Sequence, residues 1–394
     1  MNILYYTCDK VHSTKGGTER TTITVASQLK STHGCRCFSI YERQAPTEME
    51  DCFENEFFWP IIRNEKQNIE FLRNIIVENK IDAIIVQGAF VHVARFRKAI
   101  EGLNCRLIFA HHFQPKAELE FFKFKDIMKR HPESIPDCVR WGRDFVLYPL
   151  LRRKYEKSLA DKYKSAYMNA DNVVLLSHNF IDGYCKFGAF EESSKFRFVP
   201  NGLSFYEYLS ADELDKKKQI VLIVSRLEDR HKKISDALKI WGEVKKYPES
   251  KGWVLKIVGT GPDKEMYNRI IREERIPSVS FEGRQIPIPY YKEASIFMMT
   301  SKSESWGLTL TESQQMGVVP IAFNTYESLC DIITDNVDGR IITQGDTSAY
   351  VNAMLELMTD KVKRHRMAEA GLQTCHRFSP DKIAALWWQL LSEE

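Results

Sequence analysis

The 394-residue sequence lacks the patterns that mark several classes of protein. Its nine cysteines form no Cys-x-x-Cys pair, which argues against a disulfide framework or a zinc ribbon and predicts free thiols in a reducing compartment. No apolar run approaches the roughly 18 residues of a membrane-spanning helix, and the first residues have neither the basic nor the apolar segment of a signal peptide. The sequence therefore predicts a cytoplasmic protein, at most peripheral on a membrane.

An excess of charge of one sign and several common catalytic motifs are also missing. The 56 Lys and Arg residues nearly balance the 53 Asp and Glu residues, so the formal net charge is +3 and no nucleic-acid partner is expected. No His-Glu-x-x-His, Gly-x-Ser-x-Gly or Walker A string occurs. We therefore expect no bound metal and no cofactor.

What the sequence does contain is a repeated alternation of apolar strands and amphipathic helices. The alternation runs from residue 2 to about 115, pauses over about 116–170, and opens a second series at 216–228 with Lys-Lys-Lys-Gln-Ile-Val-Leu-Ile-Val-Ser-Arg-Leu-Glu. A hydrophobic content of 43% is ordinary for a globular protein, and the length fits two domains or three. The pattern predicts an α/β fold with two doubly wound parallel sheets.

The two predicted units meet near the Pro-Asn-Gly turn at 200–202. We place the first domain at 1–202 and the second at 203–378, and we expect the amphipathic helix at 379–394 to return to the first domain. Ligands of open sheets bind outside the carboxyl ends of the strands. Two facing sheets would therefore form a ligand-binding cleft.

The most informative stretch runs from Ser301 to Glu312 and reads Ser-Lys-Ser-Glu-Ser-Trp-Gly-Leu-Thr-Leu-Thr-Glu. A predicted strand leads into a loop and then into a helix that begins near Gly307. The start of a helix offers free backbone N–H groups to an anion, and a glycine there lets a phosphate approach closely. Glu304 and Glu312 can then bind hydroxyl groups on either side of such a phosphate.

This stretch resembles the Glu-x7-Glu element of the retaining family 4 glycosyltransferases. The resemblance implies the GT-B fold, in which two Rossmann-like domains face a cleft. It implies that Glu312 binds the nucleotide ribose and that Glu304 contacts the donor sugar. The backbone at Gly307 and Leu308 would hold the distal phosphate, and Trp306 belongs to the same donor-binding stretch.

Two cations follow the first strand of the second series. Arg226 ends that strand and Lys232 lies six residues further on, so both can neutralise a diphosphate. The family carries an Arg and a Lys here for the phosphates of the leaving group. Lys233 is the adjacent alternative to Lys232, and a solvated basic turn is the alternative to a site.

The first domain contributes further candidates. Gly16 and Gly17, followed by Glu19, come soon after the first strand and resemble the family's Gly-Gly-x-Glu loop, which approaches phosphate or sugar. A predicted strand at 105–112 ends in two histidines, and the resemblance implies that His112 positions the donor sugar as a catalytic residue. His111 is the alternative, because a histidine in a core strand is more often structural.

The implied reaction transfers a hexosyl group, with retention of configuration, from a nucleotide sugar to a hydroxyl of a saccharide or lipid-linked acceptor. No Asp-x-Asp string occurs, so the metal-dependent glycosyltransferase fold lacks its ligand pair. UDP is the expected nucleotide, and GDP stays open. A UDP-sugar 2-epimerase-like enzyme and a non-catalytic sugar-nucleotide-binding subunit are the alternatives on the same scaffold.

The interrupted region is the least similar to the family. Over 123–164, twelve Lys and Arg residues stand against six Asp and Glu residues, interleaved with aromatic and leucine side chains. Such a composition fits an anionic membrane surface on the inner face of the cytoplasmic membrane. The alternative is an ordinary pair of helices whose Lys and Arg side chains lie over apolar surface.

Overall fold

The computed structural model describes residues 1–13, 16–121, 124, 128 and 134–393. By their internal contacts these residues form two compact units, Met1–Val199 with Leu386–Glu394, and Pro200–Ala385. The sequence placed the division at 202/203 and the return of the chain at 379. The last helix, α16 (Pro380–Ser392), is shared between the units and joins the first from Leu386 onward.

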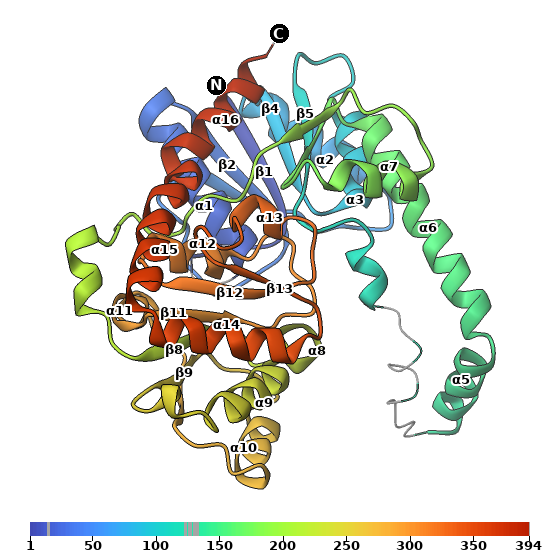
Figure 1. Cartoon of the computed structure of the whole chain (residues 1–394). Helices are drawn as coiled ribbons and strands as arrows, with labels where there is room; N and C mark the ends of the chain where they lie inside the picture. Colours follow the sequence, from blue (N-terminus) through green and yellow to red (C-terminus); the bar gives the residue numbers. More distant parts are fainter. Residues whose placement is uncertain (14–15, 122–123, 125–127, 129–133, 394) are drawn as a thin grey trace. The chain divides into compact units, whose positions relative to one another are not determined.

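The first unit is built on seven parallel strands in the order β3-β2-β1-β4-β5-β6-β7 (Figure 1). The strands are β1 (Asn2–Asp9), β2 (Arg36–Arg43), β3 (Phe53–Phe58), β4 (Ala83–Gln87), β5 (Arg106–His111), β6 (Asn172–Leu175) and β7 (Phe196–Phe198). The helices are α1 (Gly17–His33), α2 (Glu65–Glu78), α3 (Phe90–Ala99), α5 (Ile135–Val146), α6 (Tyr148–Asn169) and α7 (Phe180–Gly188). Strands β1, β4 and β5 are almost wholly buried, as continuous apolar runs in a parallel sheet should be.

The second unit has six parallel strands in the order β10-β9-β8-β11-β12-β13. They are β8 (Ile220–Val224), β9 (Val254–Val258), β10 (Val279–Gly283), β11 (Ile296–Met299), β12 (Val319–Asn324) and β13 (Arg340–Thr343). Its helices are α8 (Asp229–Lys232), α9 (Ile234–Val244), α10 (Lys264–Glu273), α11 (Ile288–Glu293), α12 (Leu308–Gln315), α13 (Leu329–Ile332), α14 (Thr347–Thr359) and α15 (Lys361–Thr374). The predicted α/β class, with two parallel sheets, is confirmed.

The end of the chain is held to the first unit by stacking and by charge. The ring of Trp388 stacks on that of His33 with centroids 4.2 Å apart. Arg106 donates hydrogen bonds to the backbone oxygens of Leu390 and Glu393, and the Glu393 carboxylate accepts from Arg197. The last part of α16 is therefore an integral part of the first unit.

Helix α12 is buried along most of its length although its side chains are mainly polar. Residues 311–315, Thr-Glu-Ser-Gln-Gln, are each at most 1% exposed. The ammonium group of Lys217 donates to the backbone oxygen of Met316, where α12 ends, and to that of Tyr291 in α11. Burial lowers the pKa of Lys217 to about 7, despite the opposing charge of Glu213.

No helix in the described residues is both long enough and apolar enough to cross a membrane.

Because the pKa of Lys217 is lowered in the folded state, the free energy of unfolding of the protein should depend on pH. Between about pH 7 and the ordinary lysine value of 10.5, the unfolded chain holds a proton that the folded chain releases, so the free energy of unfolding rises with pH. We expect wild type to gain about 2 kcal/mol over Lys217→Met between about pH 7 and about pH 9, at 1.36 kcal/mol per pKa unit. Urea unfolding of both proteins measures the difference, and a constant difference would contradict the assignment.

Candidate functional site

The predicted cations and the predicted Glu-x7-Glu stretch follow neighbouring strands. Strand β8 precedes Arg226 and Lys232, strand β11 precedes Glu304 and Gly307, and the two strands pair directly. The strand order reverses at this point, because β8 connects outward to β9 on one side and β11 to β12 on the other. The carboxyl ends at such a reversal are where ligands of open α/β sheets bind.

Arg226 lies on a loop that packs closely against the glycine turn after β9. A Cβ atom at Gly259 would lie 1.9 Å from the backbone oxygen of Ser225, and one at Gly261 would lie 2.3 Å from that of Leu227. Only glycines allow the two backbones to approach so closely. The side chain of Arg226 is 68% exposed and its guanidinium group lies 3.7 Å from the Glu228 carboxylate, so Arg226 remains accessible to a ligand.

Lys232 and Glu304 form the central contact of the site. The Lys232 ammonium group donates to Glu304 Oε1 over 2.5 Å, and the two side chains are only 29% and 13% exposed. Two hydrogen bonds to backbone oxygens hold their loops together. The N–H of Lys302 donates to the His231 oxygen over 2.7 Å, and the Thr300 hydroxyl donates to the Lys233 oxygen over 2.8 Å. The structure therefore brings together two residues that are 72 positions apart in the sequence.

Gly307 starts α12 in a backbone conformation that favours glycine. Its φ angle is +81°, and a Cβ atom there would lie 2.7 Å from the hydroxyl oxygen of Tyr326. Gly307 has no side chain that could cap α12, and the first hydrogen bond of the turn runs from the Leu310 N–H to the Gly307 oxygen, so the N–H groups of Leu308 and Thr309 are the ones that can face an anion. This end of α12 follows the same loop as Glu304.

The structure encloses two of the predicted donor-binding residues. Glu312 is 1% exposed, and its Oε2 accepts a hydrogen bond from the Tyr291 hydroxyl over 3.2 Å. Trp306 is 2% exposed and packs edge-on against Phe378, with ring centroids 5.2 Å apart. Trp306 therefore supports the loop from the core, and Glu312 is already hydrogen-bonded within the protein.

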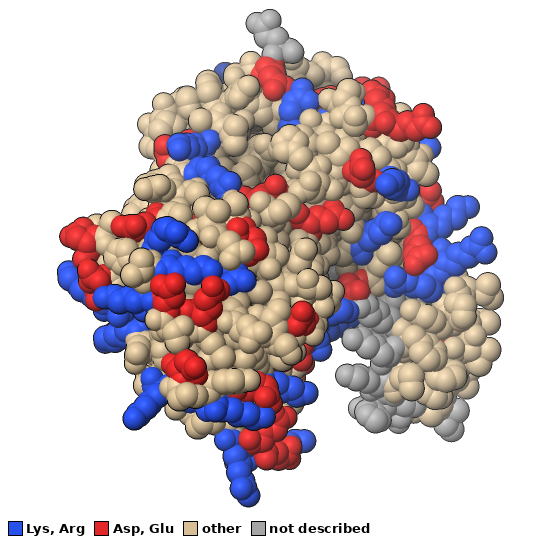
Figure 2. Space-filling model, in the orientation of Figure 1, with Lys and Arg blue, Asp and Glu red and all other residues tan. Residues whose placement is uncertain are grey.

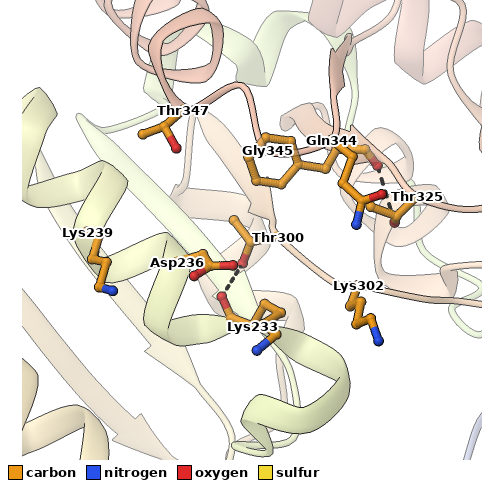
Figure 3. Close-up of a pocket in the computed structure, with 10 residues that line it drawn as sticks. Lys233, Asp236, Lys239, Thr300, Lys302, Thr325, Gln344, Gly345 and Thr347 are labelled. Carbon is orange, nitrogen blue, oxygen red and sulfur yellow. Dashed lines mark hydrogen bonds between the residues drawn. The ribbon is translucent and has the colours of Figure 1, made fainter. Parts of the chain in front are cut away.

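Lys233, the alternative to Lys232, lines a different space (Figure 3). The chain turns at Lys233, whose φ angle is +50°, and its side chain lies 3.5 Å from Asp229 rather than beside Glu304. The cavity has a volume of about 420 Å³ and is lined by Lys233, Asp236, Lys239, Thr300, Lys302, Phe323, Thr325, Gln344, Gly345 and Thr347. Lys232 therefore contacts Glu304, whereas the adjacent Lys233 lines this cavity.

In the first unit, Gly16 and Gly17 lie where the loop after β1 leads into α1. Gly16 is the N-cap residue and α1 begins at Gly17. A Cβ atom at Gly16 would lie 2.8 Å from Oε2 of Glu19, so the glutamate side chain folds back over the start of the helix. Lys15 of the same predicted loop lies outside the described residues.

The two histidines after β5 have different surroundings. The His111 side chain is fully buried, and its Nε2 lies 2.9 Å from Oε1 of Glu118. The hydroxyl of Tyr163 donates to the other carboxylate oxygen over 2.8 Å. Burial tends to raise the pKa of Glu118, but the hydrogen bond and charge of His111 outweigh it and hold this pKa below its ordinary value. His111 is thus a core residue, whereas His112 is half-buried at the end of the strand.

Sequence reasoning did not find Lys217, Tyr291, Tyr326 or Glu118, which hold these elements in place. No local motif marks them, because each acts through partners far away in the sequence. No group of three His, Cys, Asp or Glu side chains that could hold a metal ion occurs among the residues the structure describes.

The Gly307 geometry predicts a defined effect of Gly307→Ala. Gly345 has nearly the same φ angle, +82°, but a Cβ atom there would have no neighbour within 4 Å. We expect Gly345→Ala to lower the free energy of unfolding by about 1 kcal/mol, the cost of the backbone conformation alone. Gly307→Ala should cost on the order of 1–3 kcal/mol more, because of the contact with Tyr326.

The double variant Gly307→Ala/Tyr326→Phe should recover most of that excess, because it removes the hydroxyl that the new methyl group meets. Urea unfolding measures all three variants. Equal losses for the two glycine variants would show that the site does not depend on this close approach.

The sequence is similar to a known protein family and to several curated proteins. Residues 207–374 match the model of the family described as glycosyl transferases group 1. Among curated proteins, the amylovoran biosynthesis glycosyltransferase AmsD of Erwinia amylovora is 27% identical over 183 residues, which are 46% of this chain and 50% of AmsD. The chain spans about half the length of the curated relatives it matches.

Solved structures share the architecture of the whole chain. The lipopolysaccharide outer core galactosyltransferase WaaB has a TM-score of 0.68 at 17% identity, over 99% of this chain and 98% of WaaB. Anabaena HepE, in complex with UDP and glucose, has a TM-score of 0.73 at 15% identity, over 100% of this chain and 99% of HepE. At such low identity these likenesses show the fold. The second unit therefore carries a match to the glycosyl transferases group 1 model over residues 207–374, and the chain as a whole has the GT-B fold.

Proposed function

We propose that this protein is a retaining glycosyltransferase of family 4. It would move a hexosyl group from a nucleotide sugar, a UDP-hexose such as UDP-galactose or UDP-glucose, to a hydroxyl of a saccharide or glycolipid acceptor in cell-envelope glycan synthesis. The observation that carries the proposal is the 2.5 Å contact between Lys232, which follows β8, and Glu304, on the loop that leads from β11 into α12. The two strands pair directly, so the contact lies at their carboxyl ends.

The proposed donor site holds the diphosphate by three kinds of positive charge. Lys232 supplies an ammonium group, Arg226 an exposed guanidinium group, and the N–H groups after Gly307 the positive end of a helix. As the diphosphate leaves, its negative charge grows. Groups that are already in place stabilise that charge without rearranging, which favours the transition state over the bound donor.

The remaining proposed roles concern the sugar and the nucleoside. Glu304 would bind hydroxyls of the donor sugar while Lys232 holds its carboxylate in position. Glu312 would bind the ribose, whose hydroxyls would replace the Tyr291 hydroxyl at Oε2. In the first unit, Gly16 and Gly17 would approach the donor, and His112 would position the sugar and support the developing positive charge through its backbone oxygen.

The proposed chemistry needs no covalent intermediate, metal or cofactor. The bond between the anomeric carbon and the diphosphate oxygen breaks, and a bond from the same carbon to the acceptor oxygen forms on the same face. The acceptor proton passes to the departing phosphate. The products are a glycoside with retained configuration and a nucleoside diphosphate.

The names of similar proteins support the acceptor class. AmsD is named as a glycosyltransferase of amylovoran biosynthesis and WaaB as a galactosyltransferase of the lipopolysaccharide outer core. We therefore propose a lipid-linked or envelope saccharide as acceptor, and a peripheral location at the inner face of the cytoplasmic membrane. The epimerase-like and non-catalytic alternatives are not favoured, because AmsD and WaaB are named as transferases.

A donor screen tests the proposed function. The protein should release nucleotide from one of UDP-glucose, UDP-galactose, UDP-GlcNAc or GDP-mannose, faster with bacterial membrane lipid than without, and NMR should show an α-linked product. Release of no nucleotide from any donor, with or without lipid, would contradict the proposal. A sugar product freed without an acceptor and with inverted configuration at its second carbon would indicate the epimerase instead.

The adjacent lysines offer a matched pair for the site itself. We expect Lys232→Ala to lower kcat by roughly 100-fold, as loss of one preorganised charge does, with a smaller change in KM, because the charge matters most as the diphosphate leaves. Lys233→Ala should stay close to wild type, since its side chain lines another cavity. If Lys233→Ala were impaired and Lys232→Ala stayed normal, the donor diphosphate would bind beside Lys233 instead.

A further inference from the structure

We propose that α5 and the first half of α6 form a surface that docks the protein on an anionic lipid bilayer. This docking surface consists of an apolar part (Val139, Val146 and Leu150) and a basic part (Arg153, Lys154 and Lys157). The inference rests on the proposed function in one respect: docking would bring the protein to an acceptor that is anchored in lipid.

The two helices extend away from the sheet of the first unit (Figure 1). Buried residues of α6 lie only in its second half, at Leu159, Tyr163, Ala166 and Tyr167. None of the described side chains between 136 and 158 is buried. Of the predicted membrane stretch 123–164, residues 123, 125–127 and 129–133 lie outside the described residues.

Aromatic packing fixes which side of α5 faces outward. The ring of Phe145 lies 5.4 Å from that of Trp141 and 5.0 Å from that of Phe124, and Phe124 lies 5.1 Å from Tyr148 at the start of α6. These contacts form an aromatic cluster in which Phe124 bridges the end of α5 and the start of α6. The side of α5 opposite this cluster faces outward.

The apolar part of the docking surface lies on that outer side. Val139 is 70% exposed, Val146 is 73% exposed and Leu150 is 67% exposed. Val139 and Val146 are seven positions apart and lie on one face of α5, and Leu150 follows in the first turn of α6. Three aliphatic side chains that are this strongly exposed within one short stretch indicate an interaction site, whereas single exposed apolar side chains scattered over a surface do not.

The basic part continues the same face along α6. Arg153, Lys154 and Lys157 follow Leu150 by three, four and seven positions, and all three are exposed. No ion pair ties them to any described residue. Arg152, by contrast, points inward: it donates to the Leu119 oxygen over 2.5 Å and pairs with Glu156 at 2.9 Å. Arg152 therefore belongs to the fold rather than to the docking surface.

Charge decides between a bilayer and a second copy of the chain. Helix α6 carries six Lys and Arg residues against two Asp and Glu residues, and Figure 2 shows Lys and Arg side chains gathered over α6 beside a largely uncharged area over α5. In a symmetric dimer through this face, the basic part of each copy would meet the basic part of the other, and no negative charge would neutralise it. An anionic bilayer offers headgroups to the lysines and acyl chains to the aliphatic side chains.

Vesicle co-sedimentation tests the proposal with three matched triple variants. One replaces the apolar part and one the basic part by serine, and the third replaces three exposed cations of α10 in the second unit: V139S/V146S/L150S, R153S/K154S/K157S and K264S/R269S/R272S. Vesicles of phosphatidylglycerol mixed with phosphatidylcholine are compared with pure phosphatidylcholine at low salt and at about 0.5 M salt, where the Debye length falls to a few ångströms.

Wild type and the α10 control should sediment with anionic vesicles at low salt and much less with neutral ones. The basic variant should bind roughly 100-fold more weakly, since three cations near the surface are lost. The apolar variant should also bind more weakly but keep its steep salt dependence. Calorimetric UDP binding should be unchanged in all three variants, which also shows that they are folded.

Three results would overturn the proposal. Wild type could stay in the supernatant with anionic vesicles at low salt, or the α10 control could lose as much binding as the basic variant. The protein could also be a dimer in solution that only the apolar variant turns into monomer, which would assign this face to a second copy. Because UDP binding is measured without lipid, failure of docking and failure of the proposed function can be told apart.

Discussion

The burial of a polar helix is the constraint on which the site in the second unit depends. Helix α12 places Thr311 to Gln315 out of contact with water, and buried polar groups need hydrogen-bond partners. Gln314 donates to the Ile332 oxygen and Gln315 to the Phe205 oxygen, while Lys217 binds the last turn. These contacts come from segments far apart in the sequence. A helix held in this way cannot slide, so its first N–H groups stay at one place at the end of β11.

The other parts of the site are arranged around that fixed helix start. The loop after β8 carries Lys232 to Glu304. The backbone N–H of Lys302 and the side-chain hydroxyl of Thr300 donate hydrogen bonds that hold the two loops together. The glycine turn after β9 then supports the loop of Arg226. Each charged group is thereby placed by backbone geometry, which suits a site that must stabilise a growing negative charge without moving.

Much of this arrangement could be predicted from the sequence, but only where local signals exist. Gly34 is such a local signal, because a glycine directly after an amphipathic run favours the end of a helix, and it ends α1 with a φ angle of +61°. Strand β3, Phe-Glu-Asn-Glu-Phe-Phe, was missed because an edge strand with alternating acids has no continuous apolar run. The basic run that contains Lys217 looks like a solvated turn, and only tertiary packing buries this one lysine. The burial of Glu312 and the separation of Lys232 from Lys233 likewise depend on neighbours that no local pattern reveals.

The central claim is that the start of α12 and Lys232 form a site for a diphosphate. The most direct test is the calorimetric affinity of the protein for UDP, UMP and uridine under identical conditions. The account predicts that UDP binds at least about tenfold more tightly than UMP, because the second phosphate adds charge-assisted hydrogen bonds of roughly 1.5–3 kcal/mol each. Uridine should bind more weakly still. Equal affinities for UDP and uridine would contradict the account, because the phosphates would then make no contact with the helix or the lysine.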